Sequence, residues 1–358
     1  MSVTRTTLRP GYDISRVIRG GWQLAGDHGA VDRAEATRDM EAFVDAGITT
    51  FDCADIYVGV EEMIGDFIGD LRRRRGAKAA ARAQVHTKLV PDLELLENLT
   101  EPQVTAIIDR SLKRLQIEQL HLVQYYWWDV TLGDPTVGMS ALMRAQEQGK
   151  VAHIGVTNWD IAETAPLIEA GADLVSTQVQ YSLLDRRPEH GLAAWAGVNG
   201  IELLCYGTLA GGFLTDRWLG QSDPGFAFEN RSLVKYRLII DELGDWDVFQ
   251  TLLAALKSIG DKHGVSIASV ATAWVLTRPG VAAAIVGARY ARHLPQTLQV
   301  FDVALDADDL ATIDAVLSAA ASPQGPVFGL ERDRTGRHGR IMKYNLNTKP
   351  DDKVLGHG

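Results

Sequence analysis

Short β-prone runs and helical patterns alternate eight times along this chain, and this alternation constrains the fold more than any other feature. Each strand-like run is followed by a segment of helical periodicity, a pattern typical of parallel sheets. Eight such units favour a closed (β/α)8 TIM barrel over an open doubly wound sheet. The expected strands cover residues 17–23, 48–51, 84–88, 121–126, 153–157, 174–180, 202–206 and 283–287. The expected helices cover residues 31–46, 61–71, 101–115, 136–148, 161–170, 188–199, 245–263 and 267–277.

Three segments exceed a minimal barrel. Residues 1–16 predict an N-terminal hairpin that turns at Arg9-Pro10-Gly11. Residues 208–244, after the seventh strand, form a connection of unusual length, which predicts a lid loop with a helix of its own. Residues 320–358 are rich in Gly, Arg and Asp and predict a C-terminal tail over the barrel mouth. We nevertheless expect a single domain, 1–358, because α/β barrels of this size commonly form one domain.

Composition excludes several classes of function. The net charge of −10 argues against a nucleic-acid partner. Apolar runs are far shorter than the ~18 residues of a membrane span, and the N-terminus lacks the apolar region of a signal peptide, so we expect a cytoplasmic protein without a membrane partner. Cys53 and Cys205 have neither metal-type nor disulfide-type spacing, which predicts free thiols and no metal site.

An aspartate and a tyrosine mark the end of the second expected strand. Asp52 follows the apolar run, and Tyr57 lies five residues beyond it. In a βα barrel the active site is built at the C-terminal ends of the strands, so both residues are candidates for catalysis. The alternative is that Asp52 only caps the next helix.

Polar and aromatic residues also end other strands. A nicotinamide nucleotide lying across the barrel needs amides for its carboxamide, an aromatic ring for stacking and an arginine for a phosphate. The sequence offers Lys88, Thr157, Asn158, Gln178, Tyr206 and Arg289 at strand ends. Each has a structural explanation as well: a solvated lysine or arginine, a capping glutamine, a packing tyrosine. Their distribution over five strands favours ligand binding.

In order along the chain, these motifs resemble those of the aldo-keto reductase superfamily. The matching pieces are Gly20-Gly21-Trp22, Phe51-Asp52 through Tyr57, Thr87-Lys88, Gly149-Lys150 through Asn158, Gln178, Tyr206 and Gly287-Ala288-Arg289. The resemblance spans residues 17–302. It implies NAD(P)H-dependent reduction of a small carbonyl compound, or oxidation of an alcohol, without a Rossmann fold and by a monomer.

The resemblance also implies roles for three catalytic residues. Tyr57 would be the general acid that protonates the carbonyl oxygen as hydride arrives from C4 of the nicotinamide. A free phenol titrates near pH ~10, and the Lys88 ammonium would lower the pKa of Tyr57. Asp52 would hold Lys88 charged and in place.

The fourth catalytic residue of the family, a histidine, is replaced. The segment Leu122-Val123-Gln124-Tyr125-Tyr126-Trp127-Trp128-Asp129 aligns without a gap, and Tyr126 occupies the histidine position. A phenol can donate a hydrogen bond to the carbonyl oxygen but does not titrate near neutrality. In the family, replacements here accompany altered chemistry, such as carbon–carbon double-bond reduction, or a cofactor-binding subunit with little turnover.

The nucleotide site is the second departure. Gln296 and Thr297 stand where many relatives have Glu-Asn near the adenine, and Arg289 with Arg292 and His293 predicts a local positive site. We interpret it as a 2′-phosphate site, hence NADPH/NADP+, with NADH as the alternative. The complete expected cofactor-binding set is Gly21, Trp22, Asp52, Thr157, Asn158, Gln178, Tyr206, Gly207, Thr208, Leu209, Gly287, Arg289, His293, Gln296 and Thr297.

Aromatic residues near the strand ends predict the substrate site. The expected substrate-binding residues are Trp22, Tyr57, Trp127, Trp128 and Trp159, which suit a flat or cyclic substrate such as a sugar or an aromatic aldehyde. Two hypotheses follow. The intact Asp52, Tyr57 and Lys88 favour an NADPH-dependent reductase. Tyr126 favours a largely non-catalytic, nucleotide-binding regulatory subunit.

Overall fold

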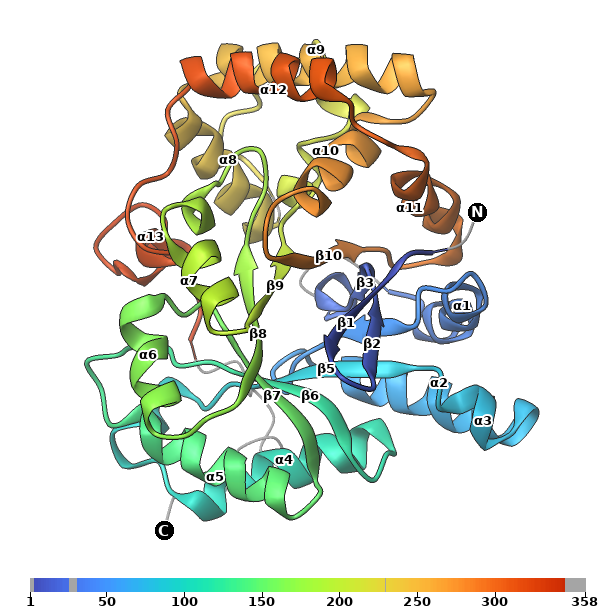
Figure 1. Ribbon diagram of the computed structural model, residues 1–358, viewed down its shortest axis with the longest axis vertical. Helices are drawn as coiled ribbons and strands as arrows, with labels where there is room; N and C mark the ends of the chain where they lie inside the picture. The colour runs from blue at the N-terminus through green and yellow to red at the C-terminus, as the bar shows by residue number, and fades with distance from the viewer. Residues whose placement is uncertain (1–2, 26–30, 229, 345–358) are drawn as a thin grey trace.

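The computed structural model describes residues 3–25, 31–228 and 230–344, and eight parallel strands close into a barrel surrounded by helices (Figure 1). The predicted (β/α)8 barrel is confirmed. The barrel strands are β3 (Val17–Gly20), β4 (Thr50–Asp52), β5 (Gln84–Leu89), β6 (Leu120–Tyr125), β7 (Val151–Thr157), β8 (Leu174–Gln180), β9 (Glu202–Tyr206) and β10 (Val281–Gly287). They pair in sequence order, and β10 closes the ring against β3.

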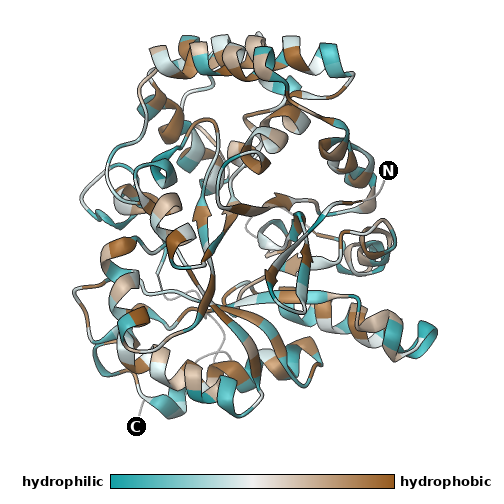
Figure 2. Cartoon of the chain, viewed as in Figure 1, coloured by the Kyte–Doolittle hydropathy of each residue, from teal (hydrophilic) through white to brown (hydrophobic). Residues whose placement is uncertain are grey.

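The helices that follow the strands are α1 (Arg33–Asp45), α2 (Val60–Arg75), α4 (Glu101–Leu115), α5 (Pro135–Glu147), α6 (Ile161–Glu169), α7 (Leu192–Val198), α9 (Trp246–His263) and α10 (Ile267–Leu276). The strands are largely brown in Figure 2 because both of their faces are buried, whereas the helices alternate brown and teal. The short helices α3 (Ala77–Ala80) and α11 (Leu294–Leu298) and the longer α12 (Ala307–Ala319) complete the outer layer. Within the described ranges, we find no helix that combines the length and the apolar character needed to cross a membrane.

Two predicted elements end earlier than expected. The first strand stops at Gly20, because Gly21 adopts a helical conformation and residues Trp22–Leu24 form a 3-10 turn. The expected helix over residues 188–199 is split into a 3-10 turn and α7 by Gly191, whose φ of 112° lies in the left-handed region that suits glycine. Gly21 and Trp22 are the only predicted site residues that these two changes move out of an expected strand or helix.

The N-terminal hairpin closes one end of the barrel. Strands β1 (Arg5–Arg9) and β2 (Tyr12–Ser15) pair antiparallel, and their apolar side chains pack against the lower layer of barrel residues. Tyr12 extends deepest, with its hydroxyl 2.8 Å from Nε2 of the buried His86. This end is therefore filled by side chains, so the opposite mouth is left for a ligand.

The lid and the tail cover that mouth. The lid, residues 208–244, contains two 3-10 turns and α8 (Arg231–Leu243). The tail runs from residue 320 through α13 (Gly329–Arg332), and part of its length contacts the lid through Arg337 and Asp241. Residues 345–358 of the predicted tail lie outside the described residues, as does residue 229 of the lid.

Three histidines lie beneath the barrel and predict how stability depends on pH. Burial lowers the pKa of His86, His121 and His153, in the case of His121 to about 4. Below pH ~6.5 these histidines bind protons in the unfolded chain but stay neutral in the native protein. Their contribution to the free energy of unfolding is therefore fully present above that pH and is lost as the pH falls. We expect His121→Asn, which keeps an acceptor for the Val85 N–H, to flatten this decline by up to ~1.4 kcal/mol per pH unit.

Urea denaturation at several pH values between 7.5 and 5 measures the effect. The exposed His190 supplies the control, since His190→Asn should follow the wild-type curve. Parallel curves for wild type and His121→Asn would show that His121 does not contribute to the pH dependence.

Candidate active site

A cavity of about 750 Å³ opens at the C-terminal mouth of the barrel, and we call it the main cavity. Its wall combines strand ends with residues of the lid and the tail. Among the predicted residues, Trp22, Asp52, Tyr57, Lys88, Tyr126, Trp128, Thr157, Asn158, Gln178, Tyr206, Gly207, Thr208, Leu209, Gly287 and Arg289 line it. The structure therefore brings most of the separated strand-end residues together around one space.

A buried ion pair lies at the base of the main cavity. The Lys88 ammonium donates to both carboxylate oxygens of Asp52, at 3.0 and 2.9 Å, and to the Cys53 carbonyl at 2.8 Å. The two side chains expose only 6% and 5% of their surface. Although burial opposes the charge of Lys88, the Asp52 carboxylate raises the pKa of the ammonium above its ordinary value. Lys88 is therefore a fixed positive charge at neutral pH.

Two amides complete the coordination of Asp52. Gln178 donates to Oδ1 of Asp52 at 2.6 Å and to Oε1 of Gln124 at 2.9 Å, and Gln124 donates to the same Asp52 oxygen at 3.3 Å. Gln124 pairs with Lys88 in the β5–β6 register. We had not singled out Gln124 from the sequence, although it lies two residues before Tyr126 and so on the same strand face. Both carboxylate oxygens of Asp52 thus accept hydrogen bonds from neighbouring side chains.

Tyr57 lies above the ion pair in the loop between β4 and α2. The Lys88 nitrogen is 5.0 Å from the centroid of the Tyr57 ring, and the centroids of the Trp22 and Tyr57 rings are 4.9 Å apart. Burial raises the pKa of Tyr57, and the Lys88 charge opposes that rise only in part. The expectation of a net lowering is therefore wrong for the free protein, because desolvation of the phenolate is the larger effect. Tyr57 remains protonated at neutral pH.

Arg114 of α4 anchors the Tyr57 loop from behind. Its guanidinium donates to the Asp55 carbonyl at 2.9 Å and lies 3.4 Å from the buried Glu61 carboxylate. Glu61 also accepts from the Thr87 hydroxyl at 2.6 Å. These contacts fix the loop on both sides of Tyr57, which limits how far its hydroxyl can move.

Tyr126 faces the main cavity from the end of β6. Its ring meets Trp128 edge-on at 4.9 Å and Phe328 of the tail at 6.1 Å. The side chain is only 5% exposed, and burial raises the pKa of its hydroxyl. Tyr126 is therefore a neutral hydrogen-bond donor at the cavity wall. Another histidine could in principle serve in place of the family's catalytic histidine. However, His86 and His121 lie on β5 and β6 and do not line the main cavity, and His28, in the first βα loop, lies outside the described residues.

Glycines and buried polar atoms shape the far side of the main cavity. A Cβ at Gly207, whose φ is 71°, would lie 2.5 Å from the Tyr236 hydroxyl, and one at Gly287 would lie 2.4 Å from the Gln23 amide. Gly207 suits only glycine because of its positive φ, whereas a side chain at position 287 would require the Gln23 amide to move. The buried Thr208 Oγ1 and Gln23 Oε1 have no hydrogen-bond partner among the described residues. Unpaired buried polar atoms beside a glycine-lined wall are typical of a site built for a polar ligand.

The wall of the main cavity is strongly positive in a negative protein. Among the described lining residues, Asp52 is the single carboxylate and is paired with Lys88. The other charged lining residues are Arg217, Arg231, Lys235, Arg289 and Lys343. This excess of positive charge suits a ligand with phosphate groups.

The predicted adenine-side residues line a separate space. His293, Gln296 and Thr297 surround a side cavity of about 90 Å³, which shares Leu209 and Gly287 with the main cavity. The positive site expected around Arg289 is weaker than predicted. Arg292 pairs with Glu35 at 3.4 Å, and burial with the neighbouring arginines lowers the pKa of His293, so the imidazole is neutral.

Three predicted binding residues line neither cavity, and the expectations for them are corrected. Trp127 and Trp159 are fully buried beside Tyr125, on the helix-facing side of the strands. The alternation of side chains along a strand explains this for Trp127, since Tyr126 points inward. Gly21 packs against the Asp52 backbone, where a Cβ would lie 2.7 Å from the carbonyl oxygen.

Several wall residues were missed because they come from the lid and the tail. They include Arg217, Asn230, Arg231, Ser232, Lys235, Phe328 and Lys343. The rule that active-site residues lie at the C-terminal ends of barrel strands does not apply to the lid and the tail. Their positions over the mouth are set by tertiary contacts. The only available signal was their placement in segments that exceed the minimal barrel.

Comparison with known proteins gives a consistent result. The family model described as "Aldo/keto reductase family" matches residues 16–318. The aldo-keto reductase YhdN of Bacillus subtilis is 28% identical over 328 residues, which cover 89% of this chain and 95% of the relative.

Solved structures share the fold. The glycerol dehydrogenase AKR11B4 from Gluconobacter oxydans superimposes with a TM-score of 0.74 at 22% identity, over 91% of this chain and 98% of that one. An aldo-keto reductase from Klebsiella pneumoniae in complex with NADPH gives a TM-score of 0.67 at 23% identity, with the same coverage of 91% and 98%.

The buried ion pair generates a stability prediction. Asp52→Asn leaves the Lys88 ammonium buried without a carboxylate, and breaking such a pair typically costs ~3–5 kcal/mol. Replacing both residues, as in Asp52→Asn with Lys88→Met, removes the uncompensated charge, so we expect a smaller loss than for the single substitution. Chemical denaturation of wild type, Asp52→Asn, Lys88→Met and the double variant measures both effects. A double variant that loses as much as the sum of the two single variants would contradict the coupling.

Proposed function

Because the chain belongs to the aldo/keto reductase family, and is therefore an oxidoreductase, we propose that it reduces an aldehyde or ketone to an alcohol, reversibly, with NADPH as the hydride donor. The observation that carries this proposal is the cluster of Tyr57, Lys88 and Asp52 at the base of the main cavity. A neutral phenol beside a fixed ammonium is a proton donor whose conjugate base is stabilised where it forms.

The far side of the main cavity fits a nicotinamide dinucleotide. Asn158 and Gln178 would hold the carboxamide, and the Tyr206 ring, tethered to Asn158 Oδ1 by a 2.8 Å hydrogen bond, would stack on the nicotinamide. Residues 207–209 with Arg217 would hold the pyrophosphate, and Arg289 the 2′-phosphate. The side cavity would receive part of the adenosine end. When bound, the nicotinamide supplies the hydride.

Tyr57 acts on the carbonyl oxygen. Its raised pKa keeps the hydroxyl protonated until the oxygen gains negative charge, and the proton then passes to that oxygen. The phenolate left behind is stabilised by Lys88, which in turn is held by Asp52 and the Cys53 carbonyl. In alcohol oxidation the same groups act in reverse.

Tyr126 is the second donor toward the carbonyl oxygen. Its hydroxyl is neutral and lies on the cavity wall next to Trp128. Two donors at one developing oxyanion stabilise the transition state more than one. Tyr126 orients and stabilises, whereas Tyr57, which lies against Lys88, gives the proton.

The replacement of the family histidine by Tyr126 favours a second candidate, a nucleotide-binding regulatory subunit with little turnover. NADPH oxidation, followed by absorbance against a panel of aldehydes and ketones, separates the two. Turnover of any carbonyl compound supports the reductase. NADPH binding without turnover across the panel supports the subunit.

Arg289 generates a prediction on cofactor choice. We expect wild type to bind NADPH more tightly than NADH, and Arg289→Ala to weaken NADPH binding by roughly 10-fold or more, in line with a lost charge-assisted contact. NADH binding should change little, because it lacks the 2′-phosphate. Fluorescence titration with both cofactors measures this. Equal losses for NADPH and NADH would show that Arg289 does not contact the 2′-phosphate.

The two tyrosines generate a prediction on the chemical step. Tyr57→Phe should abolish reduction with nearly unchanged NADPH affinity, because only the proton donor is lost. Tyr126→Phe should lower the rate roughly a hundredfold, the usual effect of removing one oxyanion donor. Single-turnover kinetics with one good substrate measure both.

Tyr126→His is the matched control. It restores the family pattern, so it should remain active and gain a titration near pH ~6.5 that wild type lacks. A pH–rate profile records it. A Tyr126→Phe enzyme as fast as wild type would show that Tyr126 only fills space.

A further inference from the structure

Lys235 of the lid helix α8 lies on the wall of the main cavity among aromatic rings. Its ammonium is 5.3 Å from the centroids of Tyr206 and Phe328, and its side chain is only 15% exposed. The mechanism proposed above uses Tyr206 but gives Lys235 no role. A buried ammonium at a ligand site requires an explanation, because desolvation of the charge is costly.

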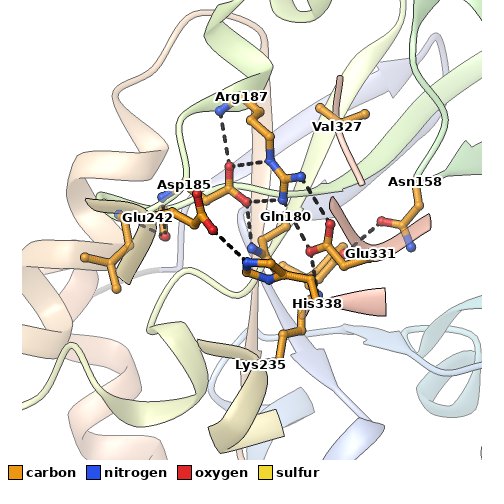
Figure 3. Close-up of polar contacts among 12 residues, drawn as sticks. Asn158, Gln180, Asp185, Arg187, Lys235, Glu242, Val327, Glu331 and His338 are labelled. Carbon is orange, nitrogen blue, oxygen red and sulfur yellow. Dashed lines mark hydrogen bonds and ion pairs between the residues drawn. The ribbon is translucent and has the colours of Figure 1, made fainter. Parts of the chain in front are cut away.

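Glu331 of the tail is the counterion of Lys235, but it is already engaged. Figure 3 shows the Arg187 guanidinium between the carboxylates of Asp185 and Glu331. Arg187 donates to Glu331 at 3.1 and 3.3 Å and to Asp185 at 2.9 and 2.6 Å, whereas Lys235 lies 3.5 Å from Glu331. These four residues, which we call the ionic quartet, are neutral only when Lys235 is charged.

The ammonium therefore keeps its charge and most of its donor capacity. Burial lowers the pKa of Lys235 and Glu331 opposes that change, while the pKa of Glu331 is lowered to about 2, against the effect of burial, by Lys235 and Arg187. A lysine has three N–H donors. Across residues 3–25, 31–228 and 230–344, the one oxygen that Lys235 meets is Glu331 Oε1, at the long limit for a hydrogen bond.

The same side of the main cavity offers further donors and few acceptors. Trp128, on the wall and 7% exposed, has an indole N–H with no partner among the described residues. Tyr126 adds its hydroxyl. Asp52 is the one carboxylate of the described wall, and its oxygens are occupied by Lys88, Gln124 and Gln178.

Phe328 lies near both Lys235 and Tyr126, with its ring centroid 5.3 Å from the ammonium and 6.1 Å from the centroid of the Tyr126 ring. An aromatic side chain is therefore close to both the ammonium and the proposed reacting end. On the basis of the proposed function, we propose that the substrates of this reductase are planar, aromatic carbonyl compounds that carry a carboxylate, and that Lys235 binds this carboxylate. Lys235 is then a specificity-determining residue.

Two substrates that differ only in charge test the proposal: 4-carboxybenzaldehyde and methyl 4-formylbenzoate, assayed with NADPH. A hydrogen bond to a charged group supports a preference of roughly 10- to 100-fold in kcat/KM for the carboxylate. We expect Lys235→Met to abolish this preference, chiefly by raising the KM of the carboxylate substrate. Lys235→Arg should keep the preference.

A double variant removes the concern that Lys235→Met leaves the ionic quartet negatively charged. Lys235→Met with Glu331→Gln keeps the quartet neutral through Arg187 and Asp185, and it should lose the preference as the single variant does. If the double variant still prefers the carboxylate, Lys235 is not the anchor and the proposal is overturned.

The outcomes also separate this inference from the proposed function. Equal kcat/KM values for the two wild-type substrates would overturn the inference and leave the reductase intact. If neither compound is reduced, the reductase proposal loses support, and calorimetric binding of the two compounds to the NADPH complex decides the inference. Tighter binding of the carboxylate that depends on Lys235 supports it, and equal binding overturns it.

Discussion

The buried pair of Asp52 and Lys88 is the interaction on which the rest of the site depends. Two charges withdrawn from water are stable only when every remaining donor and acceptor is matched, and here the Cys53 carbonyl, Gln124 and Gln178 complete the set. This requirement fixes the polar residues of four strands, β4, β5, β6 and β8, at the mouth of the barrel. It also places the Lys88 ammonium 5.0 Å from the centroid of the Tyr57 ring, where the proposed mechanism needs a positive charge.

The architecture was largely predictable because its signal is local and repeated. Eight apolar runs alternating with helical patterns indicate a parallel barrel even when the conformations of the loops are not known. The errors occurred where a single backbone conformation decides: Gly191, with a positive φ, splits one expected helix, and Gly21 turns the chain after β3. Such breaks depend on one residue, which a pattern averaged over ten residues does not resolve.

The site was predictable on the strand side only. Asp52, Lys88 and Tyr126 follow from position at strand ends, but Trp127 was assigned to the wrong face, although the alternation that places Tyr126 inward already points Trp127 toward the helices. The lid and tail residues follow no such rule. Lys235 and Phe328 reach the main cavity because α8 and the tail dock over the mouth, and contacts between distant segments decide that docking.

The ionic quartet explains how those distant segments are held. Arg187 follows β8, Lys235 belongs to the lid and Glu331 to the tail. The buried Glu331 carboxylate, which contacts both Arg187 and Lys235, therefore joins three parts of the chain. Because a buried charge tolerates little displacement from its partner, the quartet keeps Phe328 and Lys235 at fixed positions on the cavity wall. The Asp52–Lys88 pair and the ionic quartet thus occupy different parts of the fold. The pair lies on barrel strands at the base of the main cavity, while the quartet links the segment after β8 to the lid and the tail, which form part of the cavity wall.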